Sequence, residues 1–444
     1  MPVQGSLDDT IYALATASGR AGVAVLRISG PGAGVALAAV MDGRDLPAPR
    51  RAHLTAFIDP VSGEALDRGL VLWFPAPDSF TGEDVAELHA HGSPAVITAL
   101  LEALGRLPGC RLAEAGEFTR RAFQNGKMDL TQAEGLADLI AAETEAQRRQ
   151  AQRQMEGALG RLYEGWRADL IGALAYLEAD IDFPDEDLPG GLLARQGPVL
   201  ERLTAEMSAH LDDDHRGERL REGCHMVILG APNVGKSSLL NALAQRDAAI
   251  VSAQAGTTRD IVEVYLNLGG YPVVLADTAG LRVSDDEVEA EGVRRAQVRG
   301  QGADLKIVLY DCSVAPEADA AVRALAGDNG VLVASKVDLA AAAPAHGLAV
   351  STKTGEGLAA LMRRLEAEAK LRMVGGGLPG LTRLRHRQGL EECRDALLRG
   401  LAQADEELVA EDVRLAARHL GRITGRVDVE DILDIVFNDF CIGK

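Results

Sequence analysis

A glycine-rich segment at residues 230–237 carries the clearest capacity for chemistry in this sequence. It reads Gly-Ala-Pro-Asn-Val-Gly-Lys-Ser and matches the G-x-x-x-x-G-K-S pattern at every fixed position. Its glycines let backbone N–H groups converge on phosphate oxygens, while Lys236 supplies a positive charge and Ser237 a hydroxyl for Mg²⁺. The apolar run 226–229 predicts a strand before the segment, and residues 238–243 predict a helix after it. The sequence therefore predicts a phosphate-binding loop in the context that such a loop requires.

Four shorter motifs follow in chain order and indicate which nucleotide is bound. Residues 256–260 offer a threonine to Mg²⁺, and residues 277–280 (Asp-Thr-Ala-Gly) offer a carboxylate near the metal and a glycine amide near the γ-phosphate. Residues 335–338 (Ser-Lys-Val-Asp) follow a predicted strand, and the carboxylate of Asp338 can accept hydrogen bonds from the two guanine N–H groups that adenine lacks. Residues 351–353 (Ser-Thr-Lys) could close over the base. This ordered series favours GTP over ATP.

Two positions depart from the usual GTPase pattern. Ser335 stands where Asn is usual, and we expect its hydroxyl to bond locally without spanning as an amide does, so that base affinity is modest and Asp338 keeps the specificity. Leu281 stands where Ras-like enzymes carry the glutamine that orients water, and an apolar side chain cannot do this. The amide oxygen of Asn233 could instead hold K⁺ beside the β and γ phosphates, much as an arginine finger would act.

A second group of reactive side chains lies on a predicted strand at residues 84–91. The period of two places one carboxylate and two imidazoles on the same face of that strand, which carries Val85, Glu87, His89 and His91. This face could bind a metal, line a polar ligand pocket or face solvent. The metal is disfavoured because same-face residues of a strand form a line and not a cap around an ion, and because no obvious fourth ligand is nearby. Arg27, within another predicted strand at 23–28, is either a surface charge or a buried anion partner.

Composition limits the class of protein. A chain of 444 residues with 47% hydrophobic residues is long enough for roughly three domains with buried cores. Its 5 cysteines form no C-x-x-C pair, which argues against a disulfide framework and a Cys-based zinc site. The first ten residues lack a leader pattern, no run is apolar for long enough to span a bilayer, and the final Cys-Ile-Gly-Lys fits a prenylation signal poorly. We therefore expect a cytoplasmic protein without a membrane anchor.

The net charge of −20 opposes general binding to nucleic acid, because phosphate contacts need clustered Lys and Arg. An RNA partner would need a local basic patch or a second protein. The most basic stretch, residues 383–387 (Arg-Leu-Arg-His-Arg), could contact an RNA backbone or simply begin an exposed helix.

Periodicity predicts the elements in the first half of the chain. Residues 1–120 alternate short strands with turns and a helix, which indicates an α+β domain. Residues 121–222 have helical spacing, which an acidic, Pro-containing loop at 182–189 interrupts and which resumes from 192 to 220. The polar, Gln- and Arg-rich stretch 147–154 is interpreted as a solvated helix face.

The second half changes pattern twice. Residues 223–374 alternate strands with helices, which is typical of a mostly parallel sheet covered on both faces, and the strands are expected at 226–229, 271–276, 305–310, 331–334 and 348–350. Residues 375–444 are helical again. We therefore expect a multidomain α/β + α protein in which an α/β nucleotide domain is inserted into a discontinuous helical domain.

Taken together, these motifs resemble the MnmE (TrmE) family of tRNA-modification GTPases over essentially the whole chain. The most specific segments are 20–30, 79–85, 116–120, 231–238, 277–282 and 440–444. The resemblance implies a folate-binding N-terminal domain that forms a homodimer, and a Ras-like nucleotide domain. It also implies an FAD-containing partner, MnmG (GidA), in a heterotetramer that adds a carboxymethylaminomethyl or aminomethyl group to C5 of the tRNA wobble uridine.

The resemblance further assigns ligands by position. Contacts to 5-formyl- or 5,10-methylene-tetrahydrofolate are expected from Arg27, Glu87, Lys127 and Lys444. The cationic side chains of Arg27 and Lys127 suit the carboxylates or carbonyls of folate, and the carboxylate of Glu87 suits its pterin N–H groups. Potassium is expected to bind Asn233, Ser252, Gln254 and Thr257, with Ser252 and Gln254 contributing backbone oxygens. Magnesium is expected to bind Ser237 and Thr258. The remaining expected GTP contacts are Val234, Gly235, Lys236, Ser238, Ala253, Ala255, Gly256, Asp277, Thr278, Ala279, Gly280, Ser335, Lys336, Val337, Asp338, Ser351, Thr352 and Lys353.

Three catalytic candidates also come from the resemblance. Glu289 matches the acid that orients the attacking water through a bridging water, and Cys441 matches the cysteine that the modification needs. Arg282 is the third candidate. The implied cycle is driven by dimerisation of two nucleotide domains, in which GTP and K⁺ order the loops 252–260 and 281–290.

Two alternatives from other classes remain at this point. A ribosome-assembly GTPase would carry a basic RNA-binding appendage and no folate site, and the net charge and the set Arg27, Glu87 and Lys127 speak against it. A folate-dependent transferase with a regulatory GTPase domain would act on a small molecule. Modification without any tRNA requirement would favour that third hypothesis.

Overall fold

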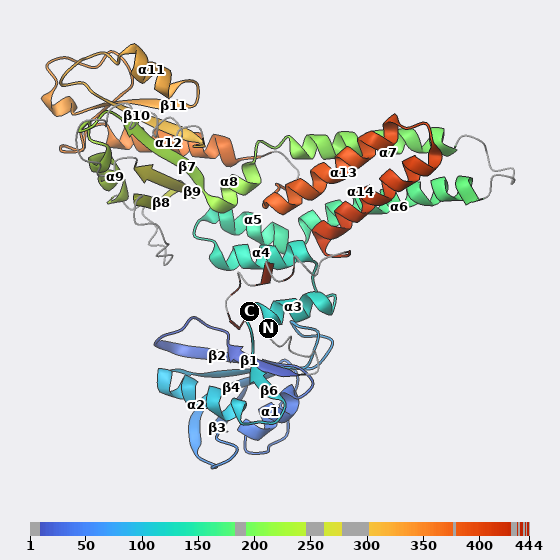
Figure 1. The fold of residues 1–444 in the computed structure, drawn as a ribbon. Helices are drawn as coiled ribbons and strands as arrows, with labels where there is room; N and C mark the ends of the chain where they lie inside the picture. Colours follow the sequence, from blue (N-terminus) through green and yellow to red (C-terminus); the bar gives the residue numbers. More distant parts are fainter. Residues whose placement is uncertain are drawn as a thin grey trace, which may run out of the picture. The chain divides into compact units, whose positions relative to one another are not determined.

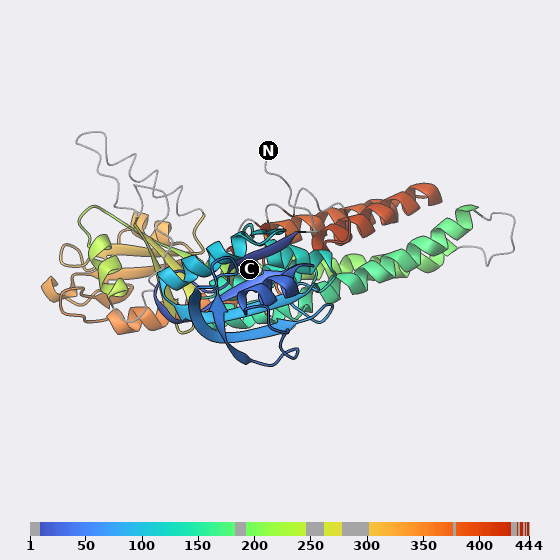
Figure 2. The same ribbon diagram turned by 90° about the horizontal axis from the view of Figure 1, so that it is seen from below.

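A computed structural model describes residues 9–182, 192–245, 262–277, 302–375, 379–427, 433, 436, 437, 440, 442 and 443. The chain divides into two compact units: the first is Met1–Ala137 with Gly421–Lys444, and the second is Asp138–Leu420. Figures 1 and 2 show the elements of both units from two directions.

The first unit is built on a six-stranded sheet with the order β3-β4-β5-β2-β1-β6. Neighbouring strands are antiparallel except β1 and β6, which are parallel. The predicted strands at 23–28 and 84–91 are confirmed. The strands are β1 Thr10–Leu14, β2 Ala21–Ser29, β3 His53–Ile58, β4 Ala65–Phe74, β5 Val85–Gly92 and β6 Cys110–Leu112.

Two helices, α1 (Ala33–Val40) and α2 (Pro94–Gly105), cover one face of this sheet (Figure 1). The core lies between them and the strands, where the cross-strand neighbours Leu26, Leu88 and Val71 are fully buried. Because side chains alternate across a strand, Arg27, Glu87 and Leu72 form the matching row on the other face of the sheet. The sheet thus has one face packed against these two helices and an opposite face on which Ile11 and Ala13 are buried against Phe118, whereas Leu54 and Leu70 are exposed.

Two further helices, α3 (Glu117–Gln124) and α4 (Leu130–Ala141), follow the sheet. Part of the C-terminal segment packs against them, since Phe437 and Phe440 share a buried apolar cluster with Leu130. The described residues at the end of the chain therefore belong to the same unit as its beginning.

The helical part of the second unit contains α5 (Glu145–Met155), α6 (Ala158–Asp182), α7 (Leu192–Leu211), α13 (Leu384–Ala402) and α14 (Glu406–Thr424). Helix α7 packs against both α6 and α13 (Figure 1). Tyr163, Trp166 and His210 make edge-on ring contacts within this packing. No helix in the described ranges combines the length and apolarity needed to cross a membrane.

The helical stretch predicted at 192–220 is divided into two helices in the structure. Helix α7 ends at Leu211, and α8 (Arg216–Glu222) begins after a turn in which Asp214 and His215 adopt left-handed backbone angles. Three consecutive aspartates occupy this turn, and Asp213 Oδ1 accepts a hydrogen bond from the backbone N–H of His215 at 3.1 Å. Short acidic side chains compete with helical hydrogen bonding in this way, so the local chemistry ends the helix.

The interpretation of 147–154 as a solvated helix face also needs correction. Arg148 and Arg149 do pair with Glu145 on the exposed side of α5. However, Gln154 is buried and accepts a hydrogen bond from the hydroxyl of Thr382 at 2.9 Å. The glutamines on that side of α5 face other elements of the unit. Their neutral amides can hydrogen-bond to buried groups there without the cost of burying a charge.

The rest of the second unit is a six-stranded sheet with the order β12-β11-β10-β7-β9-β8. It is parallel except for β8, which pairs antiparallel with β9 and which the sequence analysis missed although its residues alternate. The strands are β7 Cys224–Gly230, β8 Val262–Leu268, β9 Tyr271–Asp277, β10 Leu305–Asp311, β11 Gly330–Ser335 and β12 Leu348–Val350. The helices are α9 Lys236–Ala244, α11 Ala320–Ala326, the short 3₁₀ turn η2 Val337–Leu339 and α12 Leu358–Met373.

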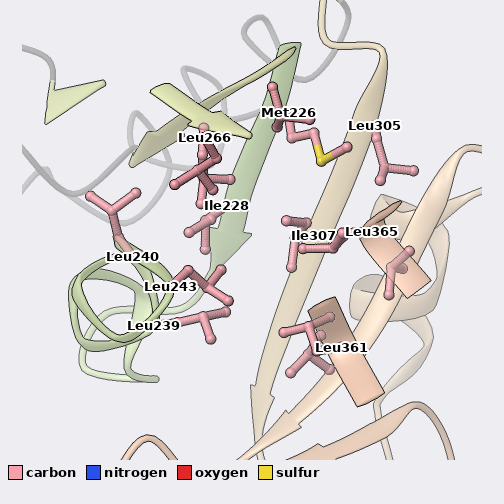
Figure 3. Packing of buried hydrophobic residues seen from close by; sticks show 14 of the residues in the cluster. Met226, Ile228, Leu239, Leu240, Leu243, Leu266, Leu305, Ile307, Leu361 and Leu365 are labelled. Carbon is pink, nitrogen blue, oxygen red and sulfur yellow. The ribbon is translucent and has the colours of Figure 1, made fainter. Parts of the chain in front are cut away.

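Helices cover both faces of this sheet, as predicted. Met226 and Ile228 of β7 pack with leucines of α9 and α12 (Figure 3). Val227 and Leu229 point the other way and pack against α11. Burial on both faces explains why β7 has a continuous run of apolar residues at 226–229 in the sequence.

Candidate functional site

The loop after β7 has the backbone shape that a phosphate site needs. Asn233 has φ +60° and Gly235 has φ +106°, both in the left-handed region. A Cβ atom built on Gly235 would meet no described atom within 4 Å, so there is open space beside the loop. Helix α9 begins at the next residue, and its free N–H groups and dipole favour an anion there. The geometry therefore fits nucleotide phosphates.

Lys236 places its ammonium group across this loop. Its Nζ donates to the carbonyl oxygens of Gly230 and Ala231, each at 2.9 Å. Burial lowers the pKa of Lys236, and the nearby carboxylate of Asp277 acts in the opposite direction. A partly desolvated cation with neutral carbonyl partners is well suited to bind a phosphate oxygen.

A hydroxyl and a carboxylate meet at the end of the two adjacent strands β7 and β9. The Oγ of Ser237 donates to Oδ2 of Asp277 at 2.6 Å, although 40 residues separate them. Two hard oxygen donors beside a phosphate site fit Mg²⁺, which keeps several waters and binds through few protein ligands. The described residues contain no cluster of three His, Cys, Asp or Glu that could hold a metal by themselves. The bound metal would neutralise phosphate charge, and these two side chains would hold it.

A small pocket lies beside the same loop, at the end of β11, in the region where the sequence predicts the base. It is lined by residues from three predicted motifs, among them Gly235, Ser238, Ser335, Lys336 and Thr352. Asp338 and Lys353 are exposed and are not among the residues that line this pocket. Lys336 Nζ donates to Asp311 Oδ2 at 2.6 Å, which anchors β11 to β10 on this side.

Ser335 does more than the sequence suggested. Its buried hydroxyl contacts the carbonyl oxygen of Val234 at 2.7 Å and that of Tyr310 at 2.9 Å. The expectation that a serine here bonds only locally is therefore wrong, because Val234 belongs to the phosphate loop 101 residues earlier. With one proton to donate, the hydroxyl serves two carbonyls less well than an amide with two N–H groups would.

Several expected site residues lie outside the described ranges. They are Ser252, Ala253, Gln254, Ala255, Gly256, Thr257, Thr258, Thr278, Ala279, Gly280, Arg282, Glu289, Cys441 and Lys444.

In the first unit, Arg27 and Glu87 form a direct cross-strand pair. The Nη2 of Arg27 lies 2.9 Å from Oε1 of Glu87, and the guanidinium stacks near the rings of Phe80 and Phe118 at 5.2 and 5.9 Å. His89 Nε2 lies 3.3 Å from the other carboxylate oxygen of Glu87. The sequence left open whether Arg27 was a surface charge or a buried anion partner, and the structure shows a half-buried ion pair.

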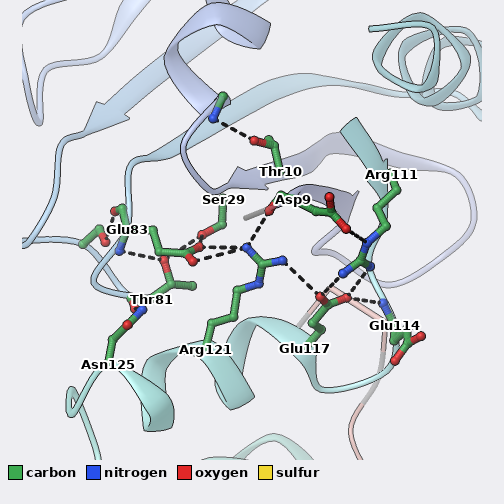
Figure 4. Close-up of polar contacts among 12 residues, drawn as sticks. Asp9, Thr10, Ser29, Thr81, Glu83, Arg111, Glu114, Glu117, Arg121 and Asn125 are labelled. Carbon is green, nitrogen blue, oxygen red and sulfur yellow. Dashed lines mark hydrogen bonds and ion pairs between the residues drawn. The ribbon is translucent and has the colours of Figure 1, made fainter. Parts of the chain in front are cut away.

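A network of ion pairs fixes the loop that carries Phe80 (Figure 4). Arg121 is fully buried, and its Nη1 lies 3.2 Å from both carboxylate oxygens of Glu83. Ser29 Oγ reaches the same loop at 2.7 Å from Thr81 Oγ1. The sequence analysis missed Arg121 and Glu83, although the i,i+4 pair of Arg121 with Glu117 is a pattern that could have drawn attention to this helix.

Two arginines of the basic stretch 383–387 are paired within the protein, so this stretch is not an ordinary exposed helix start. Arg387 is buried, and it donates to Asp213 Oδ1 at 2.6 Å and to the carbonyl of Leu211 at 2.8 Å. Arg383 pairs with Asp138 at 2.8 Å. These cations hold helices together, so they are not available to phosphates.

Comparison with known proteins identifies the family. A family model described as "MnmE helical domain" matches residues 130–441, and one described as "GTP-binding protein TrmE N-terminus" matches residues 10–127. A tRNA modification GTPase MnmE from Parvibaculum lavamentivorans is 60% identical over 98% of this chain and 100% of its own length. The chain belongs to the MnmE family.

Two further MnmE relatives show how far this similarity extends. The tRNA modification GTPase MnmE of Rhodospirillum rubrum is 57% identical over 98% of this chain and 99% of its own length. A mitochondrial 5-taurinomethyluridine tRNA synthase subunit from Danio rerio is 49% identical over 98% of this chain and 93% of its own length. MnmE-like proteins thus match this chain through all of its described elements.

Proposed function

We propose that this MnmE-family chain hydrolyses GTP and that hydrolysis serves the modification of tRNA. The observation that carries the proposal is the meeting of three parts in one site: the Lys236 loop, the Ser237–Asp277 contact at 2.6 Å and the small pocket at Ser335. Positioning and charge neutralisation are the main requirements of phosphoryl transfer, and these residues supply both.

Potassium is the proposed substitute for an arginine finger. Asn233 lies within the proposed phosphate loop and has a left-handed backbone angle, φ +60°, so its side chain belongs to the loop on which the phosphates are proposed to bind. The remaining proposed ligands, Ser252, Gln254 and Thr257, lie outside the described residues. A monovalent cation between the β and γ phosphates would stabilise charge that develops during hydrolysis.

The N-terminal domain is proposed to bind a tetrahydrofolate one-carbon donor. Arg27 and Glu87 present a fixed cation and anion side by side on the face of the sheet opposite α1 and α2, and the Phe80 ring lies against the guanidinium. Lys127 Nζ donates to the carbonyl of Pro77 at 2.9 Å, on the loop that also carries Phe80. Since Arg27 and Glu87 already pair with each other, we infer that folate binds beside the intact ion pair. It does not separate the two side chains to bind one with each of its own groups.

The same face of the sheet supports a homodimer through the N-terminal domain. Leu54 and Leu70 are direct cross-strand neighbours and are 53% and 41% exposed. Adjacent exposed leucines on a sheet face favour contact with another protein surface. We propose that a second copy covers them, and that an FAD-containing MnmG partner completes the complex that modifies C5 of the wobble uridine. The relative named as a tRNA synthase subunit supports the existence of such a partner.

The test is the rate of GTP hydrolysis by the full chain in K⁺ and in Na⁺ at equal ionic strength. We expect hydrolysis to be about 10-fold or more faster in K⁺, and this stimulation to disappear in Asn233→Ala. Asn233→Gly is the matched variant, because glycine accepts the left-handed backbone angle at this position while also removing the amide oxygen. Equal rates in both salts would refute the potassium site, and equal turnover of ATP would refute the guanine pocket.

A further inference from the structure

The N-terminal half of helix α5 is hydrogen-bonded to helix α8, which leads into the nucleotide-binding part of the second unit, and to the β8–β9 turn within that part. The backbone N–H of Ala146 donates to the carbonyl of Gly270 at 3.1 Å. The side-chain amide of Gln147 donates to the carbonyl of Arg221 at 2.9 Å, and that of Gln150 to the carbonyl of Gly217 at 2.9 Å. Consecutive positions on one helix face thus contact a hairpin turn and helix α8.

Both contacted elements lead directly into the nucleotide site. Helix α8 runs through Gly223 into β7, and β7 ends at Gly230 of the phosphate loop. Gly270 lies in the turn before β9, and β9 ends at Asp277. The strands β7 and β9 are parallel neighbours in the sheet. Helix α5 therefore holds the starting ends of the two strands whose far ends carry the Ser237–Asp277 contact.

The hairpin formed by β8 and β9 also connects the two loops expected to respond to GTP. In sequence it lies between residues 252–260 and 281–290. Each strand of the hairpin whose turn is bonded to α5 is therefore close in sequence to one of these two loops.

The hairpin turn is short and closely packed. Leu268 pairs with Tyr271 across a two-residue turn, in which Gly269 and Gly270 have φ +60° and +91°. The Oδ1 of Asn267 accepts a hydrogen bond from the N–H of Gly270 at 2.8 Å. A Cβ atom on Gly269 would lie 2.2 Å from Oε1 of Glu366, so α12 packs tightly against the turn.

We propose that Gln147 and Gln150 are positioning residues that couple the nucleotide state to the helical region of this chain. The proposal rests on the GTPase function proposed above and adds the contact through which hydrolysis would act on the helices. Neither glutamine touches the nucleotide pocket; both act through the backbone of α8, and Ala146 acts through the hairpin turn. A contiguous set of contacts between elements that move as units is one way to carry such coupling.

Gln147 has two hydrogen-bonding roles that a substitution can separate. Gln147 Oε1 also accepts hydrogen bonds from the backbone N–H groups of Glu143 and Thr144, each at 3.1 Å, which caps α5. Gln147→Glu keeps this acceptor, because glutamate also serves in a capping box, and it replaces the donor to Arg221 with a charged carboxylate oxygen that repels that carbonyl. Gln150→Glu likewise removes the donor to Gly217. Gln152→Glu makes the same charge change on the exposed side of α5 and is the matched control.

The experiment compares hydrogen exchange of the full chain bound to GDP and to a non-hydrolysable GTP analogue in K⁺ buffer. In the wild-type chain we expect the analogue to change exchange in peptides covering 145–155 as well as in the nucleotide-binding part. In the double variant Gln147→Glu, Gln150→Glu we expect the response in 145–155 to fall about 10-fold while the response in the nucleotide-binding part remains. Gln152→Glu should behave as the wild type does.

The outcomes separate this inference from the function on which it rests. A purely structural role would raise exchange in 145–155 equally with both nucleotides, and this would overturn the coupling. An unchanged response in the double variant, or no response in the wild type, would overturn it as well. Failure of the wild-type chain to hydrolyse GTP in a parallel assay would instead count against the proposed function.

Discussion

At the scale of single residues, Ser335 shows how one hydroxyl can link two parts of a site. It joins the end of β11 to the phosphate loop through Val234 and to β10 through Tyr310. The Sγ of Cys312 donates to the carbonyl of Ser335 at 2.9 Å, so the residue is fixed from both sides. The end of β11 and the phosphate loop are therefore held together by a residue that departs from the usual motif.

We predict that Ser335→Ala lowers the affinity for GDP about 10-fold, because two buried carbonyls lose their donor. Ser335→Asn should bind GDP at least as tightly as the wild type, since an amide supplies two N–H groups. Equilibrium titration with a fluorescent GDP analogue measures both values. Ser62→Ala, at an exposed serine of the first unit, serves as the control. Unchanged affinity in Ser335→Ala would show that the hydroxyl does not hold the loop.

At the scale of elements, the packing of α6 against α7 contains a buried histidine. His210 is 3% exposed, and burial lowers its pKa from 6.5 to about 4, with the charges of Arg387 and His386 acting in the same direction and that of Asp213 against it. In the unfolded chain this imidazole binds a proton below about pH 6.5. The helical packing therefore has its full stability above that pH and loses stability as the pH falls towards 4.

We predict that His210→Phe removes this acid sensitivity, because phenylalanine keeps the ring contacts and cannot take up a proton. The wild type should lose about 3 kcal/mol of unfolding free energy between pH 7 and pH 4 through this residue. Urea unfolding followed by the fluorescence of Trp166, whose ring lies 5.6 Å from that of His210, reports on this packing. Both chains would carry Trp73→Phe to isolate the signal, and His53→Gln, at an exposed histidine, is the control. Equal pH dependence in the two chains would contradict the prediction.

At the scale of the whole molecule, the described C-terminal residues pack on the first unit. The backbone of Ile442 bridges to that of Ala115, and a Cβ atom on Gly443 would lie 2.2 Å from the carbonyl of Leu14. Gly116 has φ +67°, and a Cβ atom there would lie 2.3 Å from the carbonyl of Phe437. Glycine at this position allows the close approach of the two ends of the chain.

We predict that Gly116→Ala loosens the C-terminal segment and makes trypsin cleave after Arg426 about 10-fold faster, because local opening exposes the backbone. Mass spectrometry of the truncated chain measures this rate. Gly126→Ala is a matched control, since Gly126 has φ +68° but nothing within 4 Å of the added atom. If both variants are cleaved at the same rate, backbone strain alone explains the effect and the close packing does not matter.

The sequence by itself determined the chemistry that depends on neighbours along the chain. The phosphate loop at 230–237, the strands that precede each motif and the parallel sheet all follow from local residue types and from periods of 2 and 3.6. Family membership also followed from motif order, and the comparisons confirmed it. These features are fixed over a few residues, so a single sequence is enough to predict them.

Only the tertiary structure decided what distant polar side chains do. Arg387 looked like a cation for RNA, but its partner Asp213 is 174 residues away, and Ser335 reaches a carbonyl 101 residues away. The sequence predicted a solvated face for Gln147 and Gln150, but in the structure both side-chain amides donate hydrogen bonds to backbone carbonyls of α8. The physical reason is that the free energy of a charge or an amide depends on whether a partner replaces lost water, and folding alone brings such partners together.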